Sequence, residues 1–129
     1  MTNEALKAVE KYRFVLNKGK VEEINQWISD DFIGYFGYYN NRDYEVYNCE
    51  SYRKSNVETL RSYKDKQPHW AYNDLNHNLR SETEIILSSI IDFYLSGKKV
   101  ASALAIEIFK NENDGWKLYR QHMERYSKQ

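Results

Sequence analysis

The chain contains one cysteine, Cys49, and one proline, Pro68, in 129 residues. A single cysteine excludes a disulfide bond within the chain and is typical of a reducing compartment. Five scattered glycines and a single proline leave no low-complexity segment, no glycine-rich phosphate loop and no visible linker or repeat. We therefore expect one domain that covers residues 1–129 and has no cofactor.

The chain also lacks a surplus of charge and a long hydrophobic run. Its 19 Lys and Arg residues balance 19 Asp and Glu residues, and the two signs are interleaved. A duplex-binding protein usually carries a basic excess, so no nucleic-acid partner is expected. No apolar run approaches the roughly 20 residues of a membrane span, and the first residues contain no apolar signal core. These features predict a soluble, cytoplasmic protein without a membrane partner.

Tyrosine is unusually frequent, with 12 copies beside 5 Phe and 3 Trp. Its apolar ring and polar hydroxyl suit half-buried positions, so the composition favours a lined cavity or an interface, although core packing accounts for much of it. Six of the tyrosines form a dense run, Tyr35, Tyr38, Tyr39, Tyr44, Tyr47 and Tyr52. This run predicts either a packed hairpin or a rim that faces a ligand.

Hydrophobic periodicity predicts helices in the first half of the chain and strands in the second. The helices are expected from Asn3 to Gly19, over Val21–Ile28, and from Asn48 or Ser51 to about Lys66. The strands are expected at Phe32–Tyr39, Tyr44–Tyr47 and His69–Arg80, with a turn at residues 40–43, and in a meander over Glu82–Tyr126. Helices gathered on one face of such a sheet give a two-layer α+β fold.

The meander has two largely apolar faces, whereas a sheet that is wet on one side alternates apolar and polar residues. Its turns are expected at Gly97-Lys98 and Asn113-Asp114-Gly115. Regular pairing through them gives one face Ser88, Asp92, Tyr94, Ala101, Ala103, Ala105, Glu107, Arg120 and His122. It gives the other face Leu87, Ile91, Phe93, Leu104, Ile106 and Ile108. We expect helices to cover the alanine-rich face and a second copy of the chain to cover the aliphatic face, in a two-fold homodimer.

Glu107, Arg120 and His122 are the polar residues that regular pairing of the last hairpin brings together. Depending on the turn, Glu107 lies opposite Arg120 or opposite His122, and the last two share a face. The group is either the floor of a pocket or an ion pair between Glu107 and Arg120, worth about 0.2–1 kcal/mol, with His122 hydrogen-bonded nearby. A one-residue β-bulge would move Glu107 to the other face and remove both arrangements.

Three segments carry a family resemblance: residues 9–20 (VEKYRFVLNKGK), residues 28–32 (ISDDF) and residues 114–122 (DGWKLYRQH). They are similar to the first helix, the start of the first strand and the last strand of the NTF2-like superfamily, most nearly of its SnoaL-like and steroid-isomerase-like branches. The resemblance implies a cone: a strongly curved antiparallel or mixed sheet with three helices on its concave face and an apolar pocket between them.

The resemblance also implies roles for single residues. Tyr12 falls where the steroid isomerases keep a tyrosine that stabilises an oxyanion, and Glu107 falls within one residue of their second acid at that site. The position of their general base is Phe36, and a phenyl ring cannot accept a proton. Steroid-isomerase activity is therefore not expected.

The leading hypothesis is a domain that binds a small, mostly apolar molecule in the cone. The residues predicted to bind it are Tyr12, Tyr35, Phe36, Asp92, Glu107, Arg120 and His122. One alternative is an isomerase or dehydratase in which His122 is the acid–base group and Glu107 and Tyr12 assist it. Another is a non-catalytic module for homodimerisation. No metal is expected, because His69 and His77 lack carboxylate neighbours at ligand spacing, and Cys49 is expected to be structural.

Overall fold

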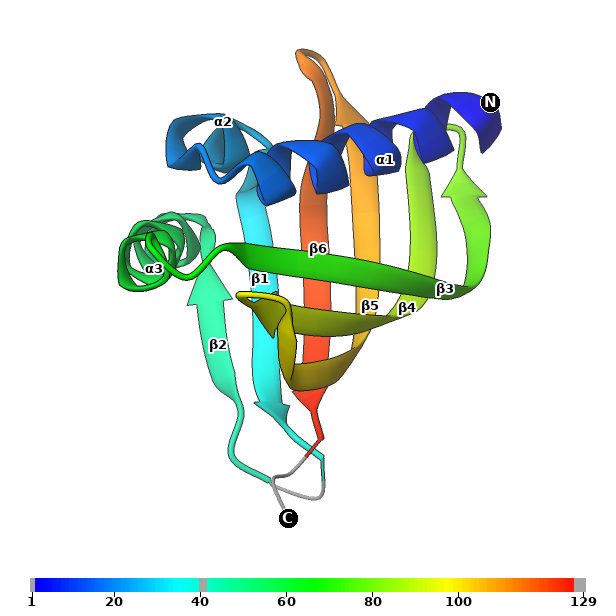
Figure 1. The fold of residues 1–129 in the computed structure, drawn as a ribbon. Helices are drawn as coiled ribbons and strands as arrows, with labels where there is room; N and C mark the ends of the chain where they lie inside the picture. Colours follow the sequence, from blue (N-terminus) through cyan, green and yellow to red (C-terminus); the bar gives the residue numbers. More distant parts are fainter. Residues whose placement is uncertain (1, 40–41, 127–129) are drawn as a thin grey trace.

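A computed structural model describes residues 2–39 and 42–126 as three helices and six strands (Figure 1). The helices are α1 (Thr2–Lys18), α2 (Val21–Gln26) and α3 (Cys49–Ser62). The strands are β1 (Ile28–Tyr38), β2 (Glu45–Asn48), β3 (Pro68–Ser81), β4 (Glu84–Leu95), β5 (Lys98–Glu112) and β6 (Gly115–Arg125). The predicted α+β class is confirmed; the predicted turn at residues 40–43 includes Asn40 and Asn41, which lie outside the described residues.

The six strands form one mixed, curved sheet that is not closed, in the order β2-β1-β6-β5-β4-β3. Only β1 and β6 pair in parallel; the other neighbours are antiparallel. Figure 1 shows α1 crossing the concave face at one end of the strands and α3 lying beside β1 and β2. Within the described residues, no helix has both the length and the apolar character that a bilayer crossing requires.

The helix boundaries follow from local sequence. Gly19 has a φ of +77°, a left-handed conformation that favours glycine, and its N–H bonds to the carbonyl of Leu16, which ends α1. At the start of α3, the Asn48 side chain accepts a bond from the Ser51 N–H (2.9 Å) while the Ser51 hydroxyl accepts one from the Asn48 N–H (3.0 Å). This capping box confirms Asn48 as the predicted helix start, although α3 ends at Ser62 rather than near Lys66.

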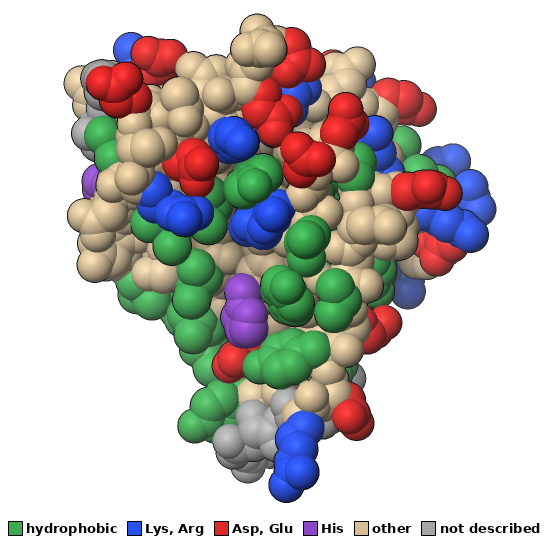
Figure 2. Space-filling view, turned by 180° about the vertical axis from the view of Figure 1, so that it is seen from behind, with side chains coloured by type: hydrophobic (Ala, Val, Ile, Leu, Met, Phe, Trp, Pro, Cys, Tyr) green, Lys and Arg blue, Asp and Glu red, His purple; other side chains and the backbone are tan. Residues whose placement is uncertain are grey.

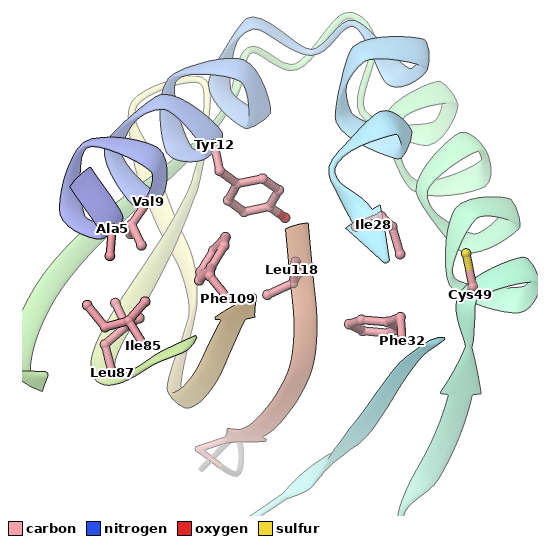
Figure 3. Packing of buried hydrophobic residues seen from close by; sticks show 10 residues of the cluster. All are labelled: Ala5, Val9, Tyr12, Ile28, Phe32, Cys49, Ile85, Leu87, Phe109 and Leu118. Atoms are coloured by element: carbon pink, nitrogen blue, oxygen red, sulfur yellow. The ribbon is translucent and has the colours of Figure 1, made fainter. Parts of the chain in front are cut away.

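The core lies between α1 and the concave face of the sheet (Figure 3). Tyr12 points from α1 towards Phe109 of β5, and the two ring centres are 5.5 Å apart in an edge-to-face contact. Leu118 of β6 and Phe32 of β1 complete this layer, and all four side chains are buried. The core thus fixes the position of Tyr12 above β5 and β6.

The alanine-bearing side of β5 faces inward, as predicted. Ala103, Ala105 and Glu107 are buried, whereas Ile106, which points the other way, is 39% exposed. Small side chains at this place let α1 approach and leave room between sheet and helices.

A β-bulge at Val100 makes the predicted match of β4 to β5 wrong. Tyr94 pairs with Lys99 and Phe93 with Ala101, so Val100 is the extra residue and every later pair shifts by one. The concave face therefore carries Leu87, Ile91 and Phe93 with the alanines. The convex face instead carries Ile86, Ser88, Ile90, Asp92 and Tyr94.

A second bulge, at Tyr119, changes the last hairpin. Phe109 pairs with Leu118 and Ile108 with Arg120, so Glu107 lies opposite Gln121. The prediction that Glu107 shares a face with Arg120 and His122 is therefore wrong. The three residues lie on opposite sides of the sheet because successive strand residues alternate in direction.

Candidate functional site

A cavity of about 290 Å³ lies between the concave face of the sheet and helices α1 and α3. Its lining comes from α1, α3 and five strands: Tyr12, Leu16, Phe36, Tyr52, Ser55, Asn56, Thr59, Tyr63, Trp70, Tyr72, Ile91, Phe93, Ala101, Ser102, Ala103, Gln121, Met123 and Arg125. Ligand pockets in proteins are mostly concave and apolar with a few placed polar groups, and this cavity has that character.

Aromatic side chains form two walls of the cavity. Phe36 of β1 and Tyr52 of α3 stack with ring centres 5.6 Å apart, and Phe32 stacks on Tyr52 at 4.5 Å. Gly34 makes this packing possible, because a Cβ there would come within 2.7 Å of the Phe36 ring. On the opposite wall Trp70 lies 4.8 Å from Phe93. The walls therefore present flat apolar surfaces that suit a planar molecule.

A hydrogen-bonded polar group closes the inner part of the site. The Tyr52 hydroxyl donates to Gln121 Oε1 (3.0 Å), and Gln121 Nε2 donates to Glu107 Oε2 (2.5 Å). Tyr12 lies close enough to Tyr52 for each to affect the pKa of the other. Glu107 itself is only 1% exposed and lies behind Gln121, which reaches the cavity.

Burial decides the protonation of this group. It raises the pKa of the Glu107 carboxyl above its ordinary value and so favours the neutral acid. Burial, reinforced by nearby Glu107, also raises the pKa of Tyr12, Tyr52 and Tyr72. Burial therefore favours the protonated form of all four groups, which makes each of them a weaker base than the ionised side chain in water.

The structure divides the predicted site residues between two faces. Tyr12 and Phe36 line the cavity, and Glu107 lies just behind it. Tyr35, Asp92, Arg120 and His122 lie on the convex face. The hypothetical set of His122 with Glu107 and Tyr12 is thus split by the sheet, and the hypothetical Glu107–Arg120 ion pair does not form.

The convex-face residues have partners of their own. His122 Nε2 lies 3.2 Å from Glu124 Oε1, which also accepts a bond from the Tyr44 hydroxyl (3.0 Å). Arg120 donates to the carbonyl of Asp31 (2.7 Å). In a separate pair, Asp92 accepts a bond from the Ser102 hydroxyl (2.6 Å).

Gln121 is the site residue that sequence reasoning missed. It lies between Arg120 and His122, the two residues that regular pairing predicts on the inner face. The bulge at Tyr119 turns Gln121 to the inner face and Arg120 and His122 to the outer face. Arg125 and the α3 side chains Ser55, Asn56 and Thr59 were also missed. Ser55 and Thr59 are spaced at i and i+4 on one helix face, a signal that could have found them.

The remaining candidate groups are not assembled for chemistry. Burial raises the pKa of the Cys49 thiol at the start of α3, which disfavours the nucleophilic thiolate. Within residues 2–39 and 42–126, no three His, Cys, Asp or Glu side chains lie together as a metal site would require.

Comparison with solved structures identifies the fold. The chain is similar to an NTF2-like protein of unknown function from Shewanella oneidensis MR-1 (TM-score 0.73, 10% identity, covering 95% of this chain and 98% of that one). It is similar to an NTF2-like protein from Cytophaga hutchinsonii ATCC 33406 (TM-score 0.69, 12% identity, covering 96% and 97%). It is also similar to a ketosteroid isomerase-like protein from Erwinia carotovora atroseptica SCRI1043 (TM-score 0.64, 15% identity, covering 98% and 96%).

The chain therefore has the NTF2-like fold, and the predicted cone is confirmed. No protein-family model and no curated protein matches the sequence. At identities of 10–15% the likeness establishes the fold alone, and one fold of this kind can serve many functions. Function must be argued from the cavity.

Proposed function

We propose that this protein binds a small, mostly apolar, planar molecule in the cavity of the cone. The observation that supports this most directly is the cavity of about 290 Å³ between two walls of aromatic rings. The hydrogen-bonding groups of Tyr52 and Gln121 at its inner part would orient one polar atom of the ligand. Such a combination of apolar walls and a few fixed polar groups is typical of small-molecule sites.

Binding is favoured over proton-transfer chemistry by the residues that reach the cavity. A general base must lie within hydrogen-bonding distance of the proton that it removes. Arg125 is the only charged residue in the described lining, and it is a cation. His122, the acid–base group of the isomerase or dehydratase alternative, lies on the convex face and does not reach the cavity. This alternative therefore has no acid–base residue at the site.

The proposal can be tested with N-phenyl-1-naphthylamine, a neutral probe whose fluorescence rises in apolar sites. Ala103 lines the cavity, and Ala103→Leu would fill part of it. We expect this change to weaken probe binding by at least about tenfold, because three added carbon atoms occupy the space of the ligand. The effect on folding should be below about 1.5 kcal/mol, because the new side chain enters open space.

Ala71→Leu is the matched control. Ala71 lies on β3 opposite Asp92, on the convex face, so the same substitution there leaves the cavity unchanged. Probe titration and thermal unfolding of both variants separate loss of the cavity from loss of the fold. Unchanged probe binding in Ala103→Leu, with that variant folded, would refute the cavity as the binding site.

We also propose that the convex face pairs two copies of the chain. Ile106, His122, Tyr35 and Val46 lie opposite one another in a row across β5, β6, β1 and β2. Ile106, Tyr35 and Val46 are 39%, 42% and 62% exposed. Figure 2 shows this side of the molecule, with hydrophobic side chains gathered on its middle and lower part. Exposed apolar residues that adjoin in this way favour an association surface.

A further inference from the structure

We propose that the ligand of the cone carries an anionic group, such as a carboxylate, and that Arg125 binds it. This inference rests on the proposed small-molecule function and adds the chemical class of the ligand. It concerns one end of the cavity, where the last residues of β6 meet the start of β5.

Arg125 is part of the cavity wall, and among residues 2–39 and 42–126 it forms no ion pair with a carboxylate. It lies opposite Ala103 on one side and Tyr38 on the other. Its Nη1 is 3.5 Å from the Tyr38 hydroxyl, and its guanidinium carbon is 5.8 Å from the centre of the Tyr38 ring. Both contacts are long, so most of its donors remain available.

Three other arginines contrast with Arg125. Arg13, Arg53 and Arg80 each form an ion pair with a carboxylate, at 2.8, 3.4 and 3.1 Å. Among residues 2–39 and 42–126, no carboxylate lies within ion-pair distance of Arg125. The guanidinium fork is well suited to a planar carboxylate, which it can bind through two parallel hydrogen bonds.

Along β6, the cavity wall between Arg125 and the inner polar group is apolar. Gln121 and Arg125 lie four residues apart on β6, which places their backbones roughly 13 Å apart along the strand. Met123 lies between them on the same side, and Ala103 faces Arg125 from β5. This order fits an elongated ligand with an apolar body and an acidic end at Arg125. With its other end such a ligand would reach Tyr52 and Gln121.

A pair of probes that differ only in charge tests this inference. The probes are 2-naphthoate and 2-naphthamide, which share the flat ring system and nearly the same shape. In the unmodified protein we expect 2-naphthoate to bind about tenfold more tightly, measured by isothermal titration calorimetry at low salt. A larger preference is not expected because Arg125 is solvent-exposed, and water screens the interaction.

Two substitutions locate the preference. Arg125→Gln should lower the affinity for 2-naphthoate to that for 2-naphthamide and leave the amide's own affinity unchanged. Arg80→Gln removes the same formal charge from the exposed part of β3, outside the cavity lining, and should leave the preference intact. Equal affinity for the two probes in the unmodified protein would overturn the inference, and so would a preference that survives Arg125→Gln.

The outcomes also separate this inference from the function on which it rests. If N-phenyl-1-naphthylamine binds and the two naphthalene probes bind equally well, the cavity is a binding site but the anionic class is wrong. If none of the three molecules binds the folded protein, both the proposed function and the anionic class are refuted.

Discussion

Glu107 is the one buried carboxyl group among the described residues, and its partner is an uncharged amide. A buried carboxylate without a cation is costly, whereas the neutral acid with one hydrogen bond is tolerated. Burial is the largest effect on the pKa of Glu107 and raises it, while the hydrogen bond from Gln121 and the charge of Arg13 lower it. The residue therefore resembles a buried amide more than an ion.

This protonation makes stability depend on pH. Burial raises the pKa of Glu107 above its ordinary value of 4.5, so the folded protein keeps a proton that the unfolded chain releases above that pH. The free energy of unfolding therefore falls as pH rises from 4.5 to the folded pKa, by at most about 1.4 kcal/mol per pH unit from this group. Glu107→Gln removes this dependence, because an amide does not titrate and its oxygen can still accept the Gln121 bond.

We therefore expect Glu107→Gln to match the unmodified protein at about pH 4.5 and to exceed it in stability at about pH 7. Urea unfolding of both proteins at a series of pH values measures the difference, in which the titration of other groups largely cancels. A difference that stays constant with pH would mean that Glu107 titrates normally. One that changes in the opposite direction would mean that its pKa is lowered.

Single residues also mark how far sequence reasoning reaches. Tyr12 and Phe36 were placed at the pocket by their position in the family pattern, and both line the cavity. Glu107 was expected near Tyr12, and the two interact inside the cone. Arg125 was not singled out, because an arginine close to a chain end has no periodic signal. Its place in the site depends on the curvature of the whole sheet.

At the scale of elements, α1 holds the edge strand β3 by two polar contacts one helical turn apart. Asn17 Nδ2 donates to the Trp70 carbonyl (3.0 Å), and Asn17 Oδ1 accepts from the Trp70 N–H (2.8 Å). Arg13 forms a two-bond pair with Asp74, at 3.0 and 2.8 Å, and its guanidinium lies 4.1 Å from the centre of the Tyr72 ring. The residues of β3 that line the cavity are therefore positioned by the helix.

Replacing Asn17 by Ala tests this attachment. The substitution leaves a backbone N–H and a carbonyl of the edge strand without their partner, so we expect a loss of about 1–3 kcal/mol in the free energy of unfolding. Hydrogen exchange of the Trp70 amide should also become faster. Lys11→Ala, on the exposed side of the same helix, is the control and should change stability by less than about 0.5 kcal/mol. Unchanged stability together with unchanged Trp70 exchange would contradict the attachment.

The elements themselves were largely predictable from the sequence, but the faces of the strands were not. Periodicity, turn residues and the alanine pattern indicated the helices, the polar edge strand and the inward side of β5. Val100 begins a run that is apolar at every position but Ser102 up to Ile106, so nothing in the sequence marks it as an extra residue. Tyr119 lies in a segment where polar and apolar residues do not alternate regularly, so the sequence does not show which of them point inward.

A β-bulge bends its strand, and each of these two reverses the match of side chains beyond it to the neighbouring strand. The bulge at Val100 moved Asp92 out of the predicted site, and the bulge at Tyr119 moved Arg120 and His122. The sequence therefore predicts that these residues are polar strand residues, but it does not predict which face of the sheet they lie on. Curvature is a property of the assembled sheet, and the pattern within one strand does not contain it.

At the scale of the whole molecule, the polar residues of β6 that do not reach the cavity form part of the convex surface. Arg120, His122 and Glu124 follow one another on the convex side of β6. Leu104, Ile106 and Ile108 flank them on β5, and Ile33 and Tyr35 flank them on β1. This face thus has a polar middle strand between two apolar ones, with a basic residue at one end of the polar set and an acidic residue at the other.

A two-fold axis that lies between the two sheets, parallel to them and perpendicular to β6 at His122, would make this face self-complementary. It would bring Arg120 of each copy to Glu124 of the other and would lay the exposed Ile106 and Tyr35 against their counterparts. Opposite charges that meet in this way fix the orientation of an interface, and like charges in the same place oppose it. The proposed homodimer therefore has a defined geometry that charge reversal can test.

We expect the unmodified protein to be a dimer at roughly 10 µM, a concentration at which an interface with a micromolar dissociation constant is mostly occupied. Glu124→Arg would place two arginines together on each side of the axis and should shift the protein towards the monomer, as should Ile106→Glu. The double variant Arg120→Glu/Glu124→Arg restores opposite charges and should recover the dimer, which a general loss of folding cannot explain. Light scattering after size-exclusion chromatography measures the mass of each variant. A monomeric unmodified protein would refute the pairing, and a double variant that stays monomeric while folded would refute the axis through His122.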